Sequence, residues 1–176
     1  MESLISAERI HKRVVELAEQ INADYGRQPV TIVGVLTGCI LFLADLVRRL
    51  DLPVSIDLIQ ASSYRGPSTI PGDLHIQLDL VPDVRGRHVL LLDDILDTGQ
   101  TLCHLVRHLR DLGAASVKVA VLLRKEGRQK FAIEPDYCGF TIPDMFVVGY
   151  GLDYNDEYRQ LPFIGVLGET PPGQIH

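Results

Sequence analysis

Three nearly continuous apolar runs constrain the fold of this chain more than any other feature of its sequence. They span Val30 to Leu36, His88 to Leu92 and Val117 to Leu123. Runs of this kind are typical of strands that are covered on both faces, as the strands of parallel sheets are. Segments with helical periodicity alternate with these runs. We therefore predict an α/β fold, with a mainly parallel sheet flanked by helices and ligands bound at the carboxyl ends of its strands.

The segments between these runs complete the pattern. Apolar residues recur on one face from Ala7 to Tyr25, which predicts an amphipathic helix that Ser6 can cap. Arg65 to Asp73 contains two prolines and two glycines, and is predicted to be a loop. Further helices are predicted at 39–50 and 101–112, and further strands at 54–64, 74–80, 136–142, 146–152 and 163–167.

Length and composition indicate one domain. With 176 residues, of which 46% are hydrophobic, the chain can bury one sizeable core but not two. We assign residues 1–167 to this domain. Residues 168–176, with two prolines and two glycines, are predicted to be a disordered tail. The cysteines, Cys39, Cys103 and Cys138, lack metal-ligand spacing and are expected to be buried free thiols.

Charge and hydropathy exclude several classes of partner. The net charge is −6 and no long basic run occurs, which argues against nucleic acid as the main partner. No apolar run reaches the roughly 20 residues that span a bilayer, and Met1 to Ile10 lacks the layout of a signal peptide. We therefore expect a cytoplasmic protein without a membrane partner.

The segment from Asp93 to Thr101 carries the most chemical information. An apolar strand delivers two adjacent carboxylates, Asp93 and Asp94, and a third, Asp97, opens a turn that leads into a helix. At a strand end these carboxylates can accept hydrogen bonds from vicinal hydroxyls or help to hold a hard cation. The free N–H groups at the start of the helix favour a phosphate. A surface turn capped by Asp97 or Thr98 would also fit the Asp-Thr-Gly tripeptide taken alone.

This segment resembles the fingerprint of the phosphoribosyltransferase family: a hydrophobic strand, two acidic residues, two mostly apolar residues, then Asp-Thr-Gly-x-Thr. The resemblance implies the type I fold of that family, with a small hood formed by the N-terminal and C-terminal segments. Our hypothesis is that Asp97 acts as the catalytic general base. The implied binding site for the ribose and its 5′-phosphate consists of Asp93, Asp94, Ile95, Leu96, Asp97, Thr98, Gly99, Gln100 and Thr101.

The hypoxanthine-guanine branch of the family gives the best match for the base site. Ile142 to Asn155 is similar to that branch's base-binding segment almost residue for residue. The resemblance makes Phe146 the ring that stacks on the purine and Val147 a backbone contact to the base. It makes Lys125 the donor to the purine 6-oxo group. An aromatic face suits a flat base, and a cation suits a carbonyl oxygen, so these roles are physically reasonable. Taken alone, Phe146 would be read as an ordinary core aromatic and Lys125 as a surface lysine.

The resemblance also implies a pyrophosphate site and a flexible loop. Thr37, Gly38 and Arg159 would contact the pyrophosphate, and Ser63 and Tyr64 would lie in a loop that closes over the site. The metal ligands would be Asp93, Asp94 and Asp153, with Mg²⁺ as the cofactor. The family usually has lysine where this chain has Thr37, so the contribution of a cation is absent there. Many relatives have glutamate where this chain has Asp93, which keeps the charge.

By this resemblance the chain is expected to join a 6-oxopurine to ribose 5-phosphate taken from phosphoribosyl pyrophosphate, in purine salvage. Family members commonly form dimers or tetramers, so a homo-oligomer is expected. Adenine is disfavoured, since Lys125 would meet an amino group, whereas xanthine stays open. The alternative outside enzymes is a regulator with this fold that binds a nucleotide and then RNA.

Overall fold

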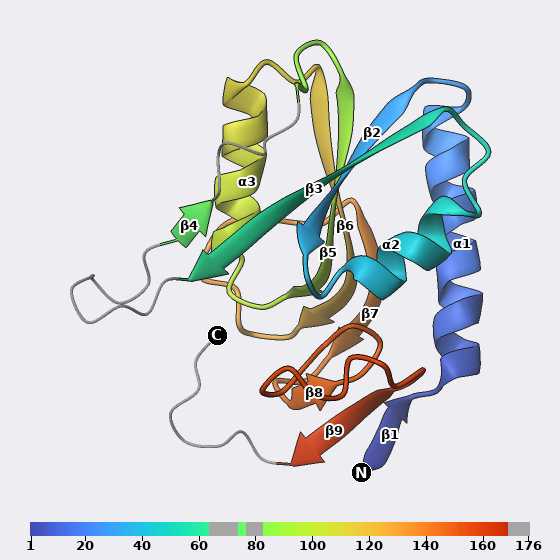
Figure 1. Cartoon of the computed structure of the whole chain (residues 1–176), viewed down its shortest axis with the longest axis vertical. Coiled ribbons are helices and arrows are strands. Elements are labelled where there is room, and N and C mark those ends of the chain that lie inside the picture. The colour runs from blue at the N-terminus through green and yellow to red at the C-terminus, as the bar shows by residue number, and fades with distance from the viewer. Residues whose placement is uncertain (64–73, 77–82, 169–176) are drawn as a thin grey trace.

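A mainly parallel sheet forms the centre of the molecule (Figure 1). The computed structural model describes residues 1–63, 74–76 and 83–168. Within these residues the strand order is β4 (Leu74–Ile76), β3 (Val54–Ser63), β2 (Val30–Leu36), β5 (His88–Leu96), β6 (Ser116–Lys125) and β7 (Tyr137–Ile142). The five strands from β3 to β7 in this order pair in parallel, and β4 pairs with β3 antiparallel at the edge. The predicted fold class is confirmed.

Helices cover both faces of this sheet. Helices α1 (Ala7–Tyr25) and α2 (Ile40–Val47) pack on one face, and α3 (Gln100–Asp111) packs on the other (Figure 1). Successive residues of a strand point to opposite faces, so Leu90 joins the core beneath α1 and α2 while Leu91 joins the core beneath α3. This burial on both faces explains the continuous apolar runs in the sequence.

The two ends of the described chain build a second, smaller sheet. Strand β9 (Ile164–Gly168) lies between β1 (Glu2–Ile5) and β8 (Phe146–Val148), and both pairings are antiparallel. Strands β1 and β9, at the two ends of the described chain, therefore lie side by side below the main sheet in Figure 1. This small sheet is the hood that the family resemblance implies. Strand β1 was not predicted, because four residues without a clear alternation carry little local signal.

Several element boundaries differ from the prediction for identifiable reasons. The predicted strand at 146–152 stops at Val148, because the backbone then turns through positive φ angles at Gly149 (99°), Tyr150 (50°) and Gly151 (98°). The helix predicted at 39–50 is limited to Ile40–Val47. Ser6 caps α1 as predicted, since its hydroxyl accepts the Arg9 N–H at 3.3 Å.

Some predicted segments fall outside the described residues. The loop at 65–73, residues 77–80 of a predicted strand, and 169–176 of the predicted tail belong to this group. Strand β9 ends at Gly168, one residue beyond the predicted end of the domain. Of the three free cysteines only Cys39 is fully buried, whereas Cys103 and Cys138 are half-buried. No helix among the described residues is long and apolar enough to cross a membrane.

Candidate active site

A cavity of about 320 Å³ lies at the carboxyl ends of β2, β5 and β6. Such crevices are where parallel α/β sheets bind ligands. Residues from several separate parts of the chain line it, and they include almost every site residue predicted from the sequence: Thr37, Gly38, Asp93, Asp94, Ile95, Leu96, Asp97, Thr98, Gly99, Gln100, Thr101, Lys125, Phe146, Val147, Asp153 and Arg159. Ser63 ends β3, but its side chain is not described, and Tyr64 lies outside the described residues.

The turn between β5 and α3 is shaped to accept an anion. Gly99 adopts a φ of 86°, which an L-residue rarely adopts, and a Cβ there would come within 2.8 Å of the Ile133 side chain. Helix α3 begins at the next residue, so its first N–H groups and the positive end of its dipole face this turn. The Thr98 hydroxyl accepts the Gln100 N–H at 3.3 Å. Glycine is therefore required here for close packing as well as for the turn.

The two adjacent carboxylates are costly to keep charged. Asp93 is buried, and its Oδ1 accepts the Asp94 N–H at 2.9 Å. Burial and the negative charge of Asp94 raise the pKa of Asp93 well above its ordinary value. Burial also raises the pKa of Asp94, while the hydrogen bond with Asp93 and the charge of Arg159 act in the opposite direction. A ligand that brings positive charge or hydroxyl donors to this pair would relieve the cost.

The donor set fits Mg²⁺ held partly by substrate. The described residues contain no group of three or more His, Cys, Asp or Glu side chains that could hold a metal ion by themselves. Mg²⁺ is commonly held by one or two carboxylates together with substrate phosphates, so Asp93 and Asp94 suffice. Asp153 is already engaged: its Oδ1 lies 2.9 Å from Arg159 Nη2, and its Oδ2 accepts the Asp156 N–H. A metal at Asp153 would share the carboxylate with Arg159.

The loop after β2 lies close to the Asp94 carboxylate and to the segment that follows β8. The Leu36–Thr37 peptide bond is cis. A Cβ on Gly38 would overlap with the Asp94 carboxylate, and a Cβ on Gly151 would overlap with the Gly38 carbonyl oxygen. Glycine at both positions therefore lets the predicted pyrophosphate loop touch the Asp94 side chain and the segment that follows β8.

The side of the cavity that is predicted to bind the base combines a buried lysine with a buried aromatic ring. Lys125, at the end of β6, is 9% exposed, and its Nζ lies 3.8 Å from Asp97 Oδ2. Phe146 is buried and meets the Tyr154 ring edge-on, with ring centroids 5.6 Å apart. Val147 is buried beside it. The sequence therefore identified side chains that do come together, from β5, β6 and β8.

Two residues of this region were not predicted. Arg128 Nε donates to Asp97 Oδ1 at 2.9 Å, and Asp144 Oδ1 lies 3.4 Å from Lys125 Nζ. The hydrogen bond to Asp97 raises the pKa of Arg128 above its ordinary value. Asp144 lies in the segment that the resemblance assigns to base binding, so its place near the site could have been predicted. No motif marks Arg128, because its partner is 31 residues earlier in the chain.

The buried carboxylate gives a testable pH dependence. Replacing Asp93 with asparagine should raise the Tm of the metal-free, ligand-free protein at pH 8 by at least about 2 °C, the size of shift that roughly 1 kcal/mol gives in a domain of this length. A raised pKa in the folded state means that the charged form destabilises the fold as pH rises above the ordinary range of aspartate. Asparagine keeps the acceptor but not the charge.

Thermal unfolding at pH 8 and at pH 5 measures this effect. The advantage of the variant should shrink toward the lower pH, where the wild-type carboxyl increasingly takes up a proton. Asp111→Asn, at the exposed end of α3, is the control and should leave Tm unchanged. A lower Tm for Asp93→Asn at pH 8 would mean that the negative charge stabilises the fold instead.

Comparison with known proteins agrees with this geometry. Residues 2–155 match the phosphoribosyl transferase domain family. The hypoxanthine-guanine phosphoribosyltransferase of Streptococcus pneumoniae is 46% identical over 167 residues, which cover 94% of this chain and 92% of that protein. The Bacillus subtilis enzyme of the same name is 43% identical over 164 residues, which cover 93% and 91%.

Solved structures give the same answer. A hypoxanthine-guanine phosphoribosyltransferase from Bacillus anthracis superposes with a TM-score of 0.86 at 37% identity, covering 94% of this chain and 96% of that one. A hypoxanthine phosphoribosyltransferase from Staphylococcus aureus gives 0.88 at 41% identity, covering 96% and 91%. The strand-end carboxylates, the glycine turn and these similarities together place the chain in the phosphoribosyltransferase family.

Proposed function

We propose that this chain transfers the 5-phosphoribosyl group from phosphoribosyl pyrophosphate to hypoxanthine and guanine, which yields IMP or GMP and pyrophosphate in purine salvage. The observation that carries the proposal is the pairing of Lys125 with Asp97 beside the buried ring of Phe146. A cation and a carboxylate stand 3.8 Å apart on one wall of the cavity. The relatives described above are named for this activity.

The 6-oxo group and N7 are neighbours on one edge of a 6-oxopurine, and the two side chains complement that edge. Lys125 would donate to the carbonyl oxygen, and Asp97 would accept the proton on N7 as N9 attacks the ribose. Adenine carries an amino group in place of the carbonyl, so Lys125 would face a donor. The purine ring would lie against Phe146, with Val147 beside the base edge.

The remaining wall of the cavity suits the donor substrate. We assign the 5′-phosphate to the turn from Asp97 to Thr101 and the ribose hydroxyls to Asp93 and Asp94. Thr37, Gly38 and Arg159 would contact the pyrophosphate. Mg²⁺ would be held by Asp93, Asp94 and Asp153 together with substrate oxygens, where it would supply positive charge to the leaving pyrophosphate.

Catalysis in this proposal is mainly positioning and electrostatic stabilisation. The bond between C1′ of the ribose and the pyrophosphate oxygen loosens, and positive charge develops on the sugar ring as the purine nitrogen approaches. Asp97 takes the proton that the purine must lose, and general-base help of this kind contributes about 10²- to 10⁴-fold. The proposed loop residues Ser63 and Tyr64 take part in none of these steps.

Three further predictions belong to this proposal. Residues 1–167 are assigned to one phosphoribosyltransferase domain, which the family match over 2–155 and the hood built from both ends of the chain support. The homo-oligomer, a dimer or tetramer, stays a prediction. The cytoplasmic location also stays a prediction.

The test is incubation of the purified protein with phosphoribosyl pyrophosphate and Mg²⁺ in four separate reactions, with hypoxanthine, guanine, xanthine or adenine. Mononucleotide should form with hypoxanthine and guanine and not with adenine. Formation of AMP alone would contradict the role of Lys125, and no mononucleotide with any base would contradict the proposed function.

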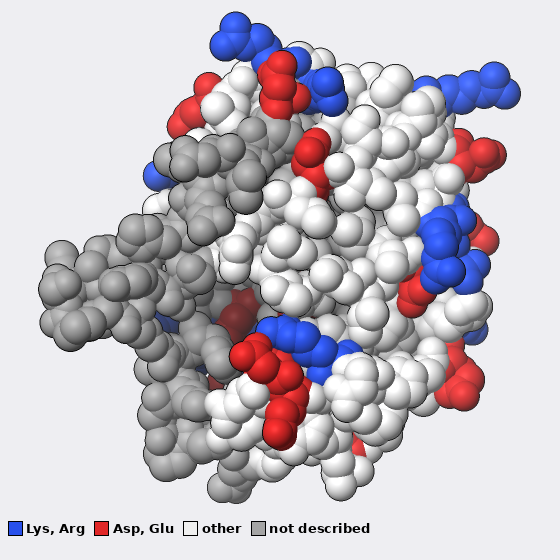
Figure 2. All heavy atoms as spheres, viewed as in Figure 1, with Lys and Arg blue, Asp and Glu red and all other residues white. Residues whose placement is uncertain are grey.

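A regulator that binds RNA is the competing function. Lys and Arg side chains are interspersed with Asp and Glu over the face shown in Figure 2, without a continuous basic patch, and the net charge of the whole chain is −6. Filter binding to RNA at low and physiological salt separates the two functions. Binding with a steep salt dependence, in the absence of transferase activity, would favour the regulator.

A further inference from the structure

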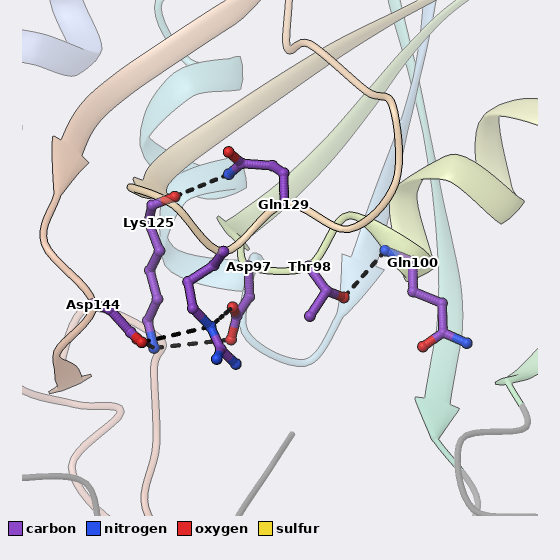
Figure 3. Close-up of polar contacts among 7 residues, drawn as sticks. Asp97, Thr98, Gln100, Lys125, Gln129 and Asp144 are labelled. Carbon is purple, nitrogen blue, oxygen red and sulfur yellow. Dashed lines mark hydrogen bonds and ion pairs between the residues drawn. The ribbon is translucent and has the colours of Figure 1, made fainter.

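Four charged side chains on the base side of the cavity form a closed ring of alternating charge (Figure 3). Arg128 Nε lies 2.9 Å from Asp97 Oδ1 and 3.7 Å from Asp144 Oδ2. Lys125 Nζ lies 3.4 Å from Asp144 Oδ1 and 3.8 Å from Asp97 Oδ2. The ring joins the turn after β5, the end of β6, the segment after β6 and the turn between β7 and β8. Two of its members, Arg128 and Asp144, have no role in the function proposed above.

The backbone on either side of Arg128 is tied to the same site. The Thr98 carbonyl oxygen accepts the Lys130 N–H at 2.9 Å and the Phe131 N–H at 3.2 Å. The Gln129 side chain donates to the Lys125 carbonyl oxygen at 2.9 Å (Figure 3). These bonds hold the segment that follows β6 against the phosphate turn. The backbone at Arg128 is therefore held in place next to the turn, from where its side chain bonds to Asp97.

The two carboxylate oxygens of Asp97 have different partners. Oδ1 accepts a well-formed hydrogen bond from Arg128, whereas the distance from Oδ2 to Lys125 is too long for a hydrogen bond. The oxygen without a hydrogen bond from this ring is thus the one that stands next to the lysine. In the function proposed above, the purine N7 and its 6-oxo group would have to meet that oxygen and that lysine side by side.

We propose that Arg128 is a positioning residue for the reaction: its Nε holds Asp97 Oδ1, and so turns Oδ2 toward the purine beside Lys125. Asp144 supports this arrangement, because it lies between the two cations of the ring. Arg128 touches neither the purine nor phosphoribosyl pyrophosphate in this proposal, so its loss should slow proton transfer more than it weakens donor binding. The inference rests on the proposed function.

Three substitutions of Arg128 separate the position of the nitrogen from its charge. Glutamine places an amide nitrogen the same number of bonds from Cα as the arginine Nε, without the charge. Lysine keeps the charge but places its nitrogen one bond further out. Methionine removes both. We expect Arg128→Met to lower kcat with hypoxanthine at least about tenfold, part of the general-base contribution, with the KM for phosphoribosyl pyrophosphate changed less than about twofold.

The order of the kcat values of these variants shows whether the position of the nitrogen or its charge matters. Arg128→Gln should retain more of the wild-type kcat than Arg128→Lys, because the hydrogen bond depends on where the nitrogen lies. If lysine restores kcat and glutamine does not, charge alone matters and the proposal is overturned. Arg124→Met is the matched control. Arg124 lies near the end of β6, pairs with Glu134 at 2.7 and 2.9 Å, and does not line the cavity. Its kcat should equal that of wild type.

A double substitution tests whether Arg128 acts through Asp97. In the Asp97→Asn background, Arg128→Met should reduce kcat by less than about twofold, because the group that it positions has already lost its function. A full tenfold further loss would show that Arg128 acts independently of Asp97. Thermal unfolding of each variant identifies losses that come from unfolding, and the comparison of glutamine with lysine holds even if Arg128→Met does not fold.

The wild-type protein in the same assay distinguishes a failure of the proposed function from a failure of the positioning role of Arg128. If wild type forms no mononucleotide, the proposed function fails. If wild type is active and folded Arg128→Met keeps the wild-type kcat, the inference alone is wrong.

Discussion

Asp97→Asn is expected to lower kcat with hypoxanthine or guanine by at least about tenfold while IMP and GMP still bind. Asparagine has nearly the shape of aspartate, and its carbonyl oxygen can still accept the hydrogen bond from Arg128 Nε. It cannot take up the proton that the purine loses, so the general-base contribution of about 10²- to 10⁴-fold is the part at risk. The turn that follows, with Gly99 packed against Ile133, is untouched by the change.

Steady-state rates and calorimetric titration with IMP measure the two effects separately. A drop in kcat with an unchanged dissociation constant for IMP is the expected pair of results. An unchanged kcat would remove Asp97 from the role of general base. Lost IMP binding together with lost turnover would show that the carboxylate holds the nucleotide itself.

Gly151→Ala should lower kcat/KM on the order of 10²-fold, the size of loss that a displacement of about 1 Å near a reacting centre can cause. Gly151 has a φ of 98°, where an L-residue is strained, and an added Cβ would overlap with the carbonyl oxygen of Gly38. That oxygen belongs to the backbone, so the overlap can be relieved only if the hood and the loop after β2 move apart. Asp153 and Arg159 would move with the hood.

Gly26→Ala provides the matched control. Gly26, at the end of α1, also has a positive φ, of 60°, but a Cβ there would meet nothing within 4 Å. It should lower Tm through backbone strain of roughly 1 to 2 kcal/mol and leave kcat/KM unchanged. Equal kinetic losses in both variants would mean that strain, and not the contact with Gly38, explains the result for Gly151.

The parts of the fold that depend on local pattern were predictable. The runs from Val30 to Leu36 and from Val117 to Leu123 are apolar because each strand is buried on both faces. The burial of each strand can therefore be predicted from its own residues. The same holds for the turn from Asp93 to Thr101, where the carboxylates, the glycine and the helix start are contiguous. The resemblance to a known family added predicted roles that no pattern contains, including those of Lys125 and Phe146, and these roles stay predictions.

The parts that depend on distant partners were not predictable. Strand β1 has four residues, and it is a strand because β9 lies beside it. Arg128 is an unremarkable arginine in the sequence, and only the packing of its segment on Thr98 brings it to Asp97. The early end of β8 follows from positive φ angles at Gly149 and Gly151, which are needed where the hood meets the backbone of Phe163 and Gly38.

The pairing of β1 with β9 sets an order on folding during synthesis. Glu2 aligns with Val166, so β1 must wait during synthesis for nearly the whole of the described chain before its partner strand emerges. The main sheet can form from strands that are close in the sequence, whereas the hood that carries Phe146 and Val147 can close only at the end. A nascent chain arrested before Ile164 would thus contain the turn from Asp97 to Thr101 without the finished hood.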